Sequence, residues 1–253
     1  MEWSTSPGVN NGLPFTKFLT FAADGTLLPS VNLDGRGEKY MPGACVACHG
    51  GSQYNGSFAK QGNPSPLLGS GFLPFDTGNY LFGSGAGLSE VAQSASFRAL
   101  NQLVSATALN PNLSPTDPAQ PPVVPLVQGW YADGTNNLNK NYVPPVWLAA
   151  DAQPQTVGAA LFYQQIVGSS CRTCHASLGP TYDWDSTLLS PSRASTHVCG
   201  GTDALALNAS MPNALISRDR VSERVLANPA LGALMTQFLG CTTPLPDPVY
   251  PKR

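Results

Sequence analysis

Two copies of one cysteine- and histidine-containing pentapeptide constrain this chain more than any other feature of its sequence. Residues 45–49 read Cys-Val-Ala-Cys-His, and residues 171–175 read Cys-Arg-Thr-Cys-His. Each copy has two thiols three positions apart and an imidazole directly after the second thiol. Together the copies contain four of the six cysteines and two of the three histidines. Any chemistry of the chain that needs thiols or imidazoles therefore centres on these two segments.

The C-x-x-C-H pattern is the attachment signature of c-type haem. Two thiols at this spacing can reach the two vinyl groups of one porphyrin and form thioethers, and the adjacent histidine then binds the iron as the proximal ligand. The sequence therefore predicts two covalently attached haem c groups. Their predicted attachment and proximal residues are Cys45, Cys48 and His49 for the first, and Cys171, Cys174 and His175 for the second.

A zinc site is the alternative interpretation of these segments, because C-x-x-C pairs also bind Zn²⁺. The two pairs are far apart in the sequence for a compact zinc ribbon, and zinc does not require a histidine directly after each pair. A thioredoxin-like redox motif would need a surrounding βαβ pattern, which neither segment has. Both observations favour haem.

Two cysteines, Cys199 and Cys241, remain outside the motifs. In an oxidising compartment we expect a disulfide between them. It would close a loop of about 42 residues and stabilise the fold by about 4 kcal/mol in the chain-entropy model. Two separate buried thiols are the alternative.

Composition and charge exclude several classes of protein. The net charge of −2 gives no basic surface for a nucleic acid, and no stretch is long and apolar enough to span a membrane. The first residues lack the features of a signal peptide, so we expect a mature chain, or part of one, from the periplasm or the extracellular space. Charged residues make up only 11%, while 25 glycines and 24 prolines indicate long ordered loops.

Local patterns predict a mainly α fold with extensive ordered loops and little β structure. Asp24-Gly25 indicates a hairpin turn, and a proline-rich linker is expected at 111–125, followed by loops over 126–150. We expect two haem domains, a divergent one over 1–125 and a second over 126–253. The apolar periodicity, capping residues and stop signals predict helices at residues 89–109, 155–167, 214–226 and 229–240.

Residues 155–243 resemble a class I c-type cytochrome. The resemblance rests on a helix containing Gly158-Ala159-Ala160-Leu161-Phe162, the second haem motif after it, the Met211-Pro212 pair and the C-terminal helix. It implies that His175 is the proximal ligand of the second haem and that Met211 is the distal one. Residues 1–125 resemble a more divergent haem c domain of secreted dihaem cytochromes.

The distal ligand of the first haem has several candidates. Met41 precedes the first motif and is followed by proline, as Met211 is, and His197 is the histidine outside the motifs. An open site, or one with another ligand, is the third possibility. Met235 lies on an apolar helical stripe, which predicts a place in the core.

These features predict a protein that relays electrons between redox partners such as other cytochromes, because His/Met ligation fills both axial positions of an iron. The alternative is an enzyme that resembles the bacterial dihaem cytochrome c peroxidases, in which the first haem is open to peroxide. A third possibility is a non-redox use of the haems, such as gas sensing at an open iron.

Overall fold

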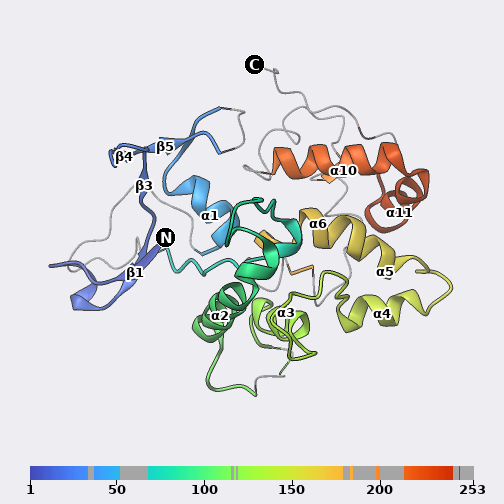
Figure 1. Cartoon of the computed structure of the whole chain (residues 1–253), viewed down its shortest axis with the longest axis horizontal. Helices are drawn as coiled ribbons and strands as arrows, with labels where there is room; N and C mark the ends of the chain where they lie inside the picture. Colours follow the sequence, from blue (N-terminus) through green and yellow to red (C-terminus); the bar gives the residue numbers. More distant parts are fainter. Residues whose placement is uncertain are drawn as a thin grey trace.

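The structure is a computed structural model in which helices predominate and strands are few and short (Figure 1), as the sequence predicts. The N-terminal strands lie on one side, helices α2 and α3 lie below, and the later helices lie on the other side. The described residues are 1–33, 37–51, 68–114, 117, 119–178, 183–184, 198–199, 214–241 and 245, with only the main chain of Leu215.

Short antiparallel strand pairs form the N-terminal part of the chain. The predicted hairpin is confirmed: β3 (Thr20–Phe21) pairs with β4 (Leu27–Leu28), and Asp24 accepts a 2.9 Å hydrogen bond from the Thr26 main-chain N–H at its turn. Gly25 has a φ of 86° there, a left-handed conformation that glycine adopts without steric penalty. The other pairs are β1 (Glu2–Ser4) with β2 (Phe15–Lys17), and β5 (Ser30–Val31) with β6 (Lys39–Tyr40).

The predicted helix after Ser89 is confirmed as α2 (Glu90–Ala108). The hydroxyl of Ser89 accepts a hydrogen bond from the Ala92 main-chain N–H at 3.3 Å and so caps the helix. Two short 3₁₀ turns lie earlier in the chain, η1 (Asn10–Gly12) and η2 (Thr77–Asn79).

The expectation of loops over 126–150 is wrong, because two helices lie there. Helix α3 (Val123–Trp130) begins inside the predicted linker 111–125, so the last residues of that linker are helical, and α4 (Pro145–Asp151) begins with a proline. Proline is compatible with the first turn of a helix, where its missing N–H is not needed. The apolar residues of α3 then stabilise it by packing against α2. Helix α3 also crosses residue 125, while the division into domains 1–125 and 126–253 stays a prediction.

The second half of the chain is built from several helices. The helix predicted at 155–167 begins later, as α5 (Ala159–Phe162), and continues through the π-helical turn η3 (Tyr163–Val167) into α6 (Gly168–Ser170). The helices predicted near 214–226 and 229–240 are confirmed as α10 (Leu215–Ala227) and α11 (Pro229–Leu239). Gly240 ends α11 in the left-handed conformation.

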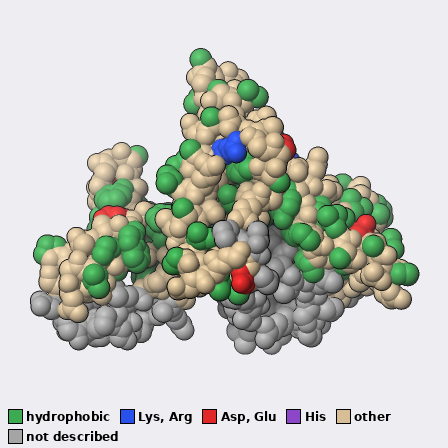
Figure 2. Space-filling model, turned by 90° about the horizontal axis from the view of Figure 1, so that it is seen from below, with side chains coloured by type: hydrophobic (Ala, Val, Ile, Leu, Met, Phe, Trp, Pro, Cys, Tyr) green, Lys and Arg blue, Asp and Glu red, His purple; other side chains and the backbone are tan. Residues whose placement is uncertain are grey.

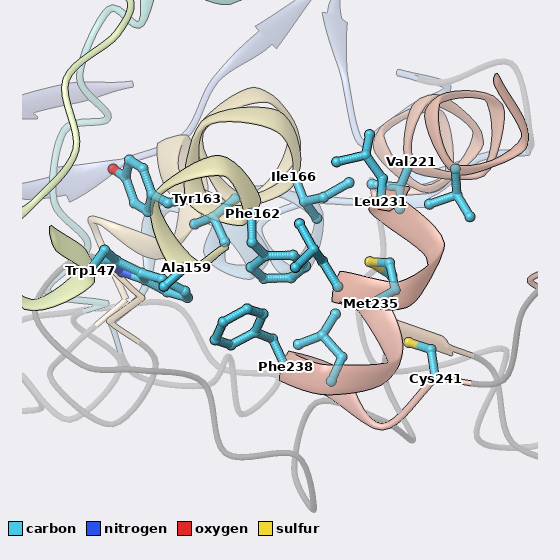
Figure 3. Packing of buried hydrophobic residues seen from close by; sticks show 14 of the residues in the cluster. Trp147, Ala159, Phe162, Tyr163, Ile166, Val221, Leu231, Met235, Phe238 and Cys241 are labelled. Carbon is cyan, nitrogen blue, oxygen red and sulfur yellow. The ribbon is translucent and has the colours of Figure 1, made fainter. Parts of the chain in front are cut away.

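Helices α4, α5, η3 and α11 surround a core of aromatic side chains. Figure 3 shows Trp147, Phe162 and Phe238 packed together, with Phe162 and Phe238 stacked at a ring distance of 5.0 Å. Met235 is fully buried in the same core, which confirms its predicted place. We call this the C-terminal cluster; it also includes Cys199 and Cys241.

A second group of buried side chains, which we call the central cluster, lies between α2 and α3. Its members are Val104, Val123, Val124, Leu126, Val127, Trp130, Tyr131, Leu138 and Ala176. Ala176 directly follows the second C-x-x-C-H segment, so this cluster reaches the candidate functional residues. The space-filling view in Figure 2 shows hydrophobic side chains across the face of the molecule and few charged ones, in keeping with the low charge content. None of the helices in the described part of the chain has the length and apolar character needed to cross a membrane.

Candidate functional site

The first C-x-x-C-H motif lies within helix α1 (Gly43–His49). Cys45 and Cys48 are both partly buried, and their spacing of three residues places them on one side of the helix. Burial raises the pKa of the Cys45 thiol. Both thiols are therefore presented from one rigid turn.

His49 ends this helix, and its orientation is set by a hydrogen bond. Its Nδ1 lies 2.9 Å from the main-chain carbonyl oxygen of Gly71. A carbonyl can only accept, so Nδ1 carries the proton, and in the neutral ring Nε2 has the lone pair. Burial lowers the pKa of His49, against an opposing effect of the Gly71 hydrogen bond, and so favours the neutral ring. A histidine oriented in this way is prepared for ligation through Nε2.

The chain after His49 passes very close to residues 68–71. Gly51 has a φ of 94°, and a Cβ there would lie 2.2 Å from the carbonyl oxygen of Leu68. The Gly71 N–H donates to the His49 carbonyl at 3.0 Å, and the Ser70 hydroxyl donates to the Gly50 carbonyl at 2.6 Å. This close packing holds Gly71 in place beside the imidazole.

The second motif is formed by Cys171 and helix α7 (Arg172–His175). His175 is buried, with 8% of its surface exposed, and its ring stacks on that of Trp184 at 4.0 Å. The carbonyl of Trp184 in turn accepts a 2.9 Å hydrogen bond from Trp147 Nε1. The imidazole is therefore connected to the C-terminal cluster through an aromatic side chain.

A buried ion pair anchors the second motif to the first half of the chain. Asp76 is fully buried and accepts hydrogen bonds from Arg172 Nε and Nη2 at 2.7 and 2.8 Å. It also accepts from the hydroxyl of Thr173 at 3.1 Å and from Asn79 at 2.9 Å. Burial alone would lower the pKa of Arg172, but the hydrogen bonds and charge of Asp76 outweigh it and raise that pKa. The guanidinium also lies over the Trp130 ring at 5.0 Å.

One segment, residues 68–79, therefore contacts both motifs, and we call it the bridging segment. Gly71 holds His49, the carbonyl of Phe72 accepts a 3.1 Å hydrogen bond from the Ser177 hydroxyl, and Asp76 binds Arg172. Phe72 and Phe75 pack against the central cluster. Nothing in the local sequence pattern singles out these residues, because their partners lie far away along the chain.

The two motifs lie against each other. The side chain of Cys48 hydrogen-bonds that of Cys174, and this contact, together with burial, raises the pKa of the Cys174 thiol. Helix α1 contacts helix α7 directly. The sequence predicts two haem-binding segments, and the structure adds that these segments are neighbours.

The remaining predicted residues have different outcomes. Cys199 and Cys241 form a disulfide with a Cα–Cα distance of 5.2 Å, so the prediction is confirmed and the alternative of two separate thiols is wrong. The sulfur of Met41 accepts a hydrogen bond from the Cys45 thiol at 3.3 Å, which places it beside a predicted attachment residue; its role as a ligand stays a prediction. Met211 and His197 lie outside the described residues.

The donor set fits covalently bound haem. Each motif presents two thiols and an imidazole from a short helical segment. His175 is buried and His49 is partly buried, and His49 has a nitrogen prepared for ligation. The indole N–H of Trp130, fully buried beside Arg172, has no hydrogen-bond acceptor among the described residues, and such a donor suits a haem propionate. Within that same part of the chain no three histidine, cysteine or acidic side chains form a group that could hold a metal ion, so these residues do not supply the four ligands of a structural zinc site.

No family model, curated protein or solved structure matches this chain. The interpretation of the site therefore rests on its own residues and their geometry.

Proposed function

We propose that this protein is a dihaem c-type cytochrome that relays electrons between redox partner proteins. The observation that carries the proposal is the grouping of two thiols and an imidazole in each C-x-x-C-H segment, with Nδ1 of His49 held by the Gly71 carbonyl and His175 buried. When bound, haem supplies one-electron chemistry at its iron. The four motif cysteines would form its thioethers, and His49 and His175 would be the proximal ligands.

The chain's own residues determine how the haems behave. Met211 is the proposed distal ligand of the second haem, in a class I cytochrome-like domain, and a filled axial position favours electron transfer over substrate binding. Met41 and His197 are the candidates for the first haem, unless that iron has an open position. Burial of His175 and partial burial of His49 would limit the access of water to the irons, which helps to set the redox potential.

A periplasmic or extracellular location belongs to the same proposal. The Cys199–Cys241 disulfide supports it, since disulfides persist in oxidising compartments. Covalent haem attachment through free thiols also needs the chain to reach a haem-attachment system before those thiols are oxidised.

The first experiment measures haem attachment. The chain is exported to the periplasm of a host with a haem-attachment system, and the intact mass is recorded. We expect two covalent haems in the unaltered chain and one in each double variant, Cys45→Ala with Cys48→Ala, or Cys171→Ala with Cys174→Ala. A mature chain that folds without covalent haem would overturn the proposal.

The second experiment tests the axial ligand and the activity. Met211→Ala should remove the weak far-red absorption band of methionine ligation from the oxidised spectrum. The matched control, Met235→Leu, alters a fully buried core methionine and should leave the band unchanged. Electron exchange with a small cytochrome, without turnover of peroxide, is the expected activity. Rapid peroxide turnover at a high-spin haem would instead identify a peroxidase.

A further inference from the structure

The two predicted haem-attachment sites share a direct contact. Cys48 and Cys174 are each the second thiol of their motif. Helix α1, which contains Cys48, contacts helix α7, which contains Cys174, and the neighbouring Cys48 raises the pKa of the Cys174 thiol. In the proposed holoprotein each of these sulfurs is bonded to a porphyrin substituent. The contact therefore brings the attachment edges of two porphyrins together, rather than placing the two cofactors at opposite ends of the molecule.

The main chain beside this contact leaves little freedom for the motifs to separate. A Cβ on Gly50, which directly follows the first motif, would lie 2.6 Å from the carbonyl oxygen of Ser177, which follows the second. This is closer than real Cβ atoms approach an oxygen, so the two segments meet backbone to backbone at a position that only glycine fits. The Ser177 hydroxyl is bound in turn by the Phe72 carbonyl.

The bridging segment fixes both motifs at once. It holds His49 through Gly71, and it holds Arg172 and Thr173 through the fully buried Asp76. Movement of α1 away from α7 would therefore have to break either the hydrogen bonds of the bridging segment to His49 and Gly50 or its buried charged network with α7. Such networks are costly to disrupt.

From these contacts we propose that the chain holds its two haems as one adjacent pair, coupled through the Cys48–Cys174 edge, so that an electron entering at one haem passes directly to the other. This inference rests on the proposed function. In the internal step one iron is oxidised by one electron and the other is reduced by one, and no bond or proton changes. The pair would also be electrostatically coupled, because a charge gained by one haem acts on the other at short range.

The test uses the holoprotein and optical circular dichroism in the Soret region. Two adjacent haems give a bisignate signal that the sum of separate haems lacks. We expect this signal in the unaltered protein, and we expect it to be absent from the summed spectra of the two single-haem variants described above. A spectrum of the unaltered protein that equals that sum would overturn the inference.

A glycine variant tests the proposed cause. Gly50→Ala should push the two motifs apart and reduce the bisignate signal, with a matching loss of magnetic interaction between the oxidised irons in electron paramagnetic resonance. Gly25→Ala is the control, because Gly25 also has a positive φ but no atom lies within 4 Å of its added Cβ; it should leave both signals unchanged. Equal signals in Gly50→Ala and the control, with two haems bound, would also overturn the inference.

The failures of the two proposals are distinguishable. Absence of covalent haem in the intact mass contradicts the proposed function itself. Two bound haems with additive spectra leave the cytochrome function in place and contradict only their adjacency.

Discussion

Replacement of Asp76 by asparagine tests how the second motif is held. The carboxylate is fully buried, and it accepts a two-point interaction from a guanidinium whose side chain is 4% exposed. Asparagine has nearly the same size and keeps one acceptor oxygen, but it removes the charge. The variant therefore leaves the charge of Arg172 uncompensated in the interior while it changes the packing very little.

The expected loss follows from the burial of the pair. Removing one partner of a buried ion pair typically costs about 3–5 kcal/mol, because the other charge stays buried without compensation. Thr173 and Asn79 also donate hydrogen bonds to this carboxylate, and asparagine would offer them only one, uncharged acceptor oxygen. We therefore expect the loss in free energy of unfolding to lie in the upper half of that range. Since domains of this kind are stable by roughly 5–15 kcal/mol, Asp76→Asn should remain folded but with a strongly reduced stability.

A surface ion pair provides the matched control. Lys140 Nζ lies 2.7 Å from Glu90, as short a contact as that between Arg172 and Asp76, but the two side chains are 51% and 34% exposed. Solvent screens such a pair, and Glu90→Gln should cost only about 0–1 kcal/mol. The two variants thus remove ion pairs of the same N–O distance, one of which is buried and the other exposed.

The measurement is urea-induced unfolding followed by tryptophan fluorescence, in the same cofactor state for every variant. The free energy of unfolding should fall several times further for Asp76→Asn than for Glu90→Gln. A double variant, Asp76→Leu with Arg172→Met, should recover much of the loss, because it removes both charges. Equal small losses for Asp76→Asn and Glu90→Gln would refute the reasoning that the buried pair anchors the motif.

Three further predictions concern other parts of the chain. Replacing Cys199 and Cys241 together by serine should lower stability by about 4 kcal/mol, and reductant should then have no further effect on the unfolding midpoint. Gly51→Ala should destabilise by roughly 1–3 kcal/mol or more through its clash with the Leu68 carbonyl, measured by the same urea titration. The hydrogen bonds that Asp133 accepts from Thr135 lower the pKa of Asp133 below its ordinary value of 3.8. Their stabilising effect is complete above that value and disappears as pH falls through the lower, folded-state pKa. The stability difference between the unaltered chain and Asp133→Asn should therefore be present at neutral pH and absent in strong acid, as thermal unfolding would measure.

Local signals predicted the elements that depend on local causes. The cap at Ser89, the Asp24-Gly25 turn and the glycine at the end of α11 act within a few residues of themselves. Ser89 accepts a hydrogen bond from a main-chain N–H that has no partner within its helix. The two glycines adopt a left-handed conformation that other residues rarely adopt. Their confirmation shows how far capping and turn chemistry determine this chain.

The helices that the sequence missed depend on packing. The prolines of residues 111–125 predict a linker, yet α3 begins inside that range, and its residues Val124, Leu126 and Trp130 are almost completely buried. Their burial stabilises a helix of eight residues that would be marginal in water. A sequence pattern does not reveal which surface will be available to cover such a short apolar run.

The candidate site likewise combines residues that the sequence predicts with contacts that it does not predict. The candidate cysteines and histidines follow from spacing alone, because the haem attachment and proximal ligation proposed for them would involve neighbouring residues. The contact of Cys48 with Cys174 and the hydrogen bond from His49 to Gly71 are tertiary. They arise because the bridging segment folds between the two motifs, and no local periodicity encodes that path.

The bridging segment also couples the two halves of the sequence energetically. Arg172 belongs to the second motif, but the carboxylate that compensates its charge is on Asp76, in the first half. A fragment of residues 126–253 would lack that carboxylate, so the guanidinium would have to become solvated or remain buried at a cost of several kcal/mol. The conformation of the second C-x-x-C-H segment thus depends on a carboxylate that precedes Arg172 by 96 positions in the sequence. We therefore expect residues 126–253 to need the first half of the chain, as well as their own core, to hold this segment in place.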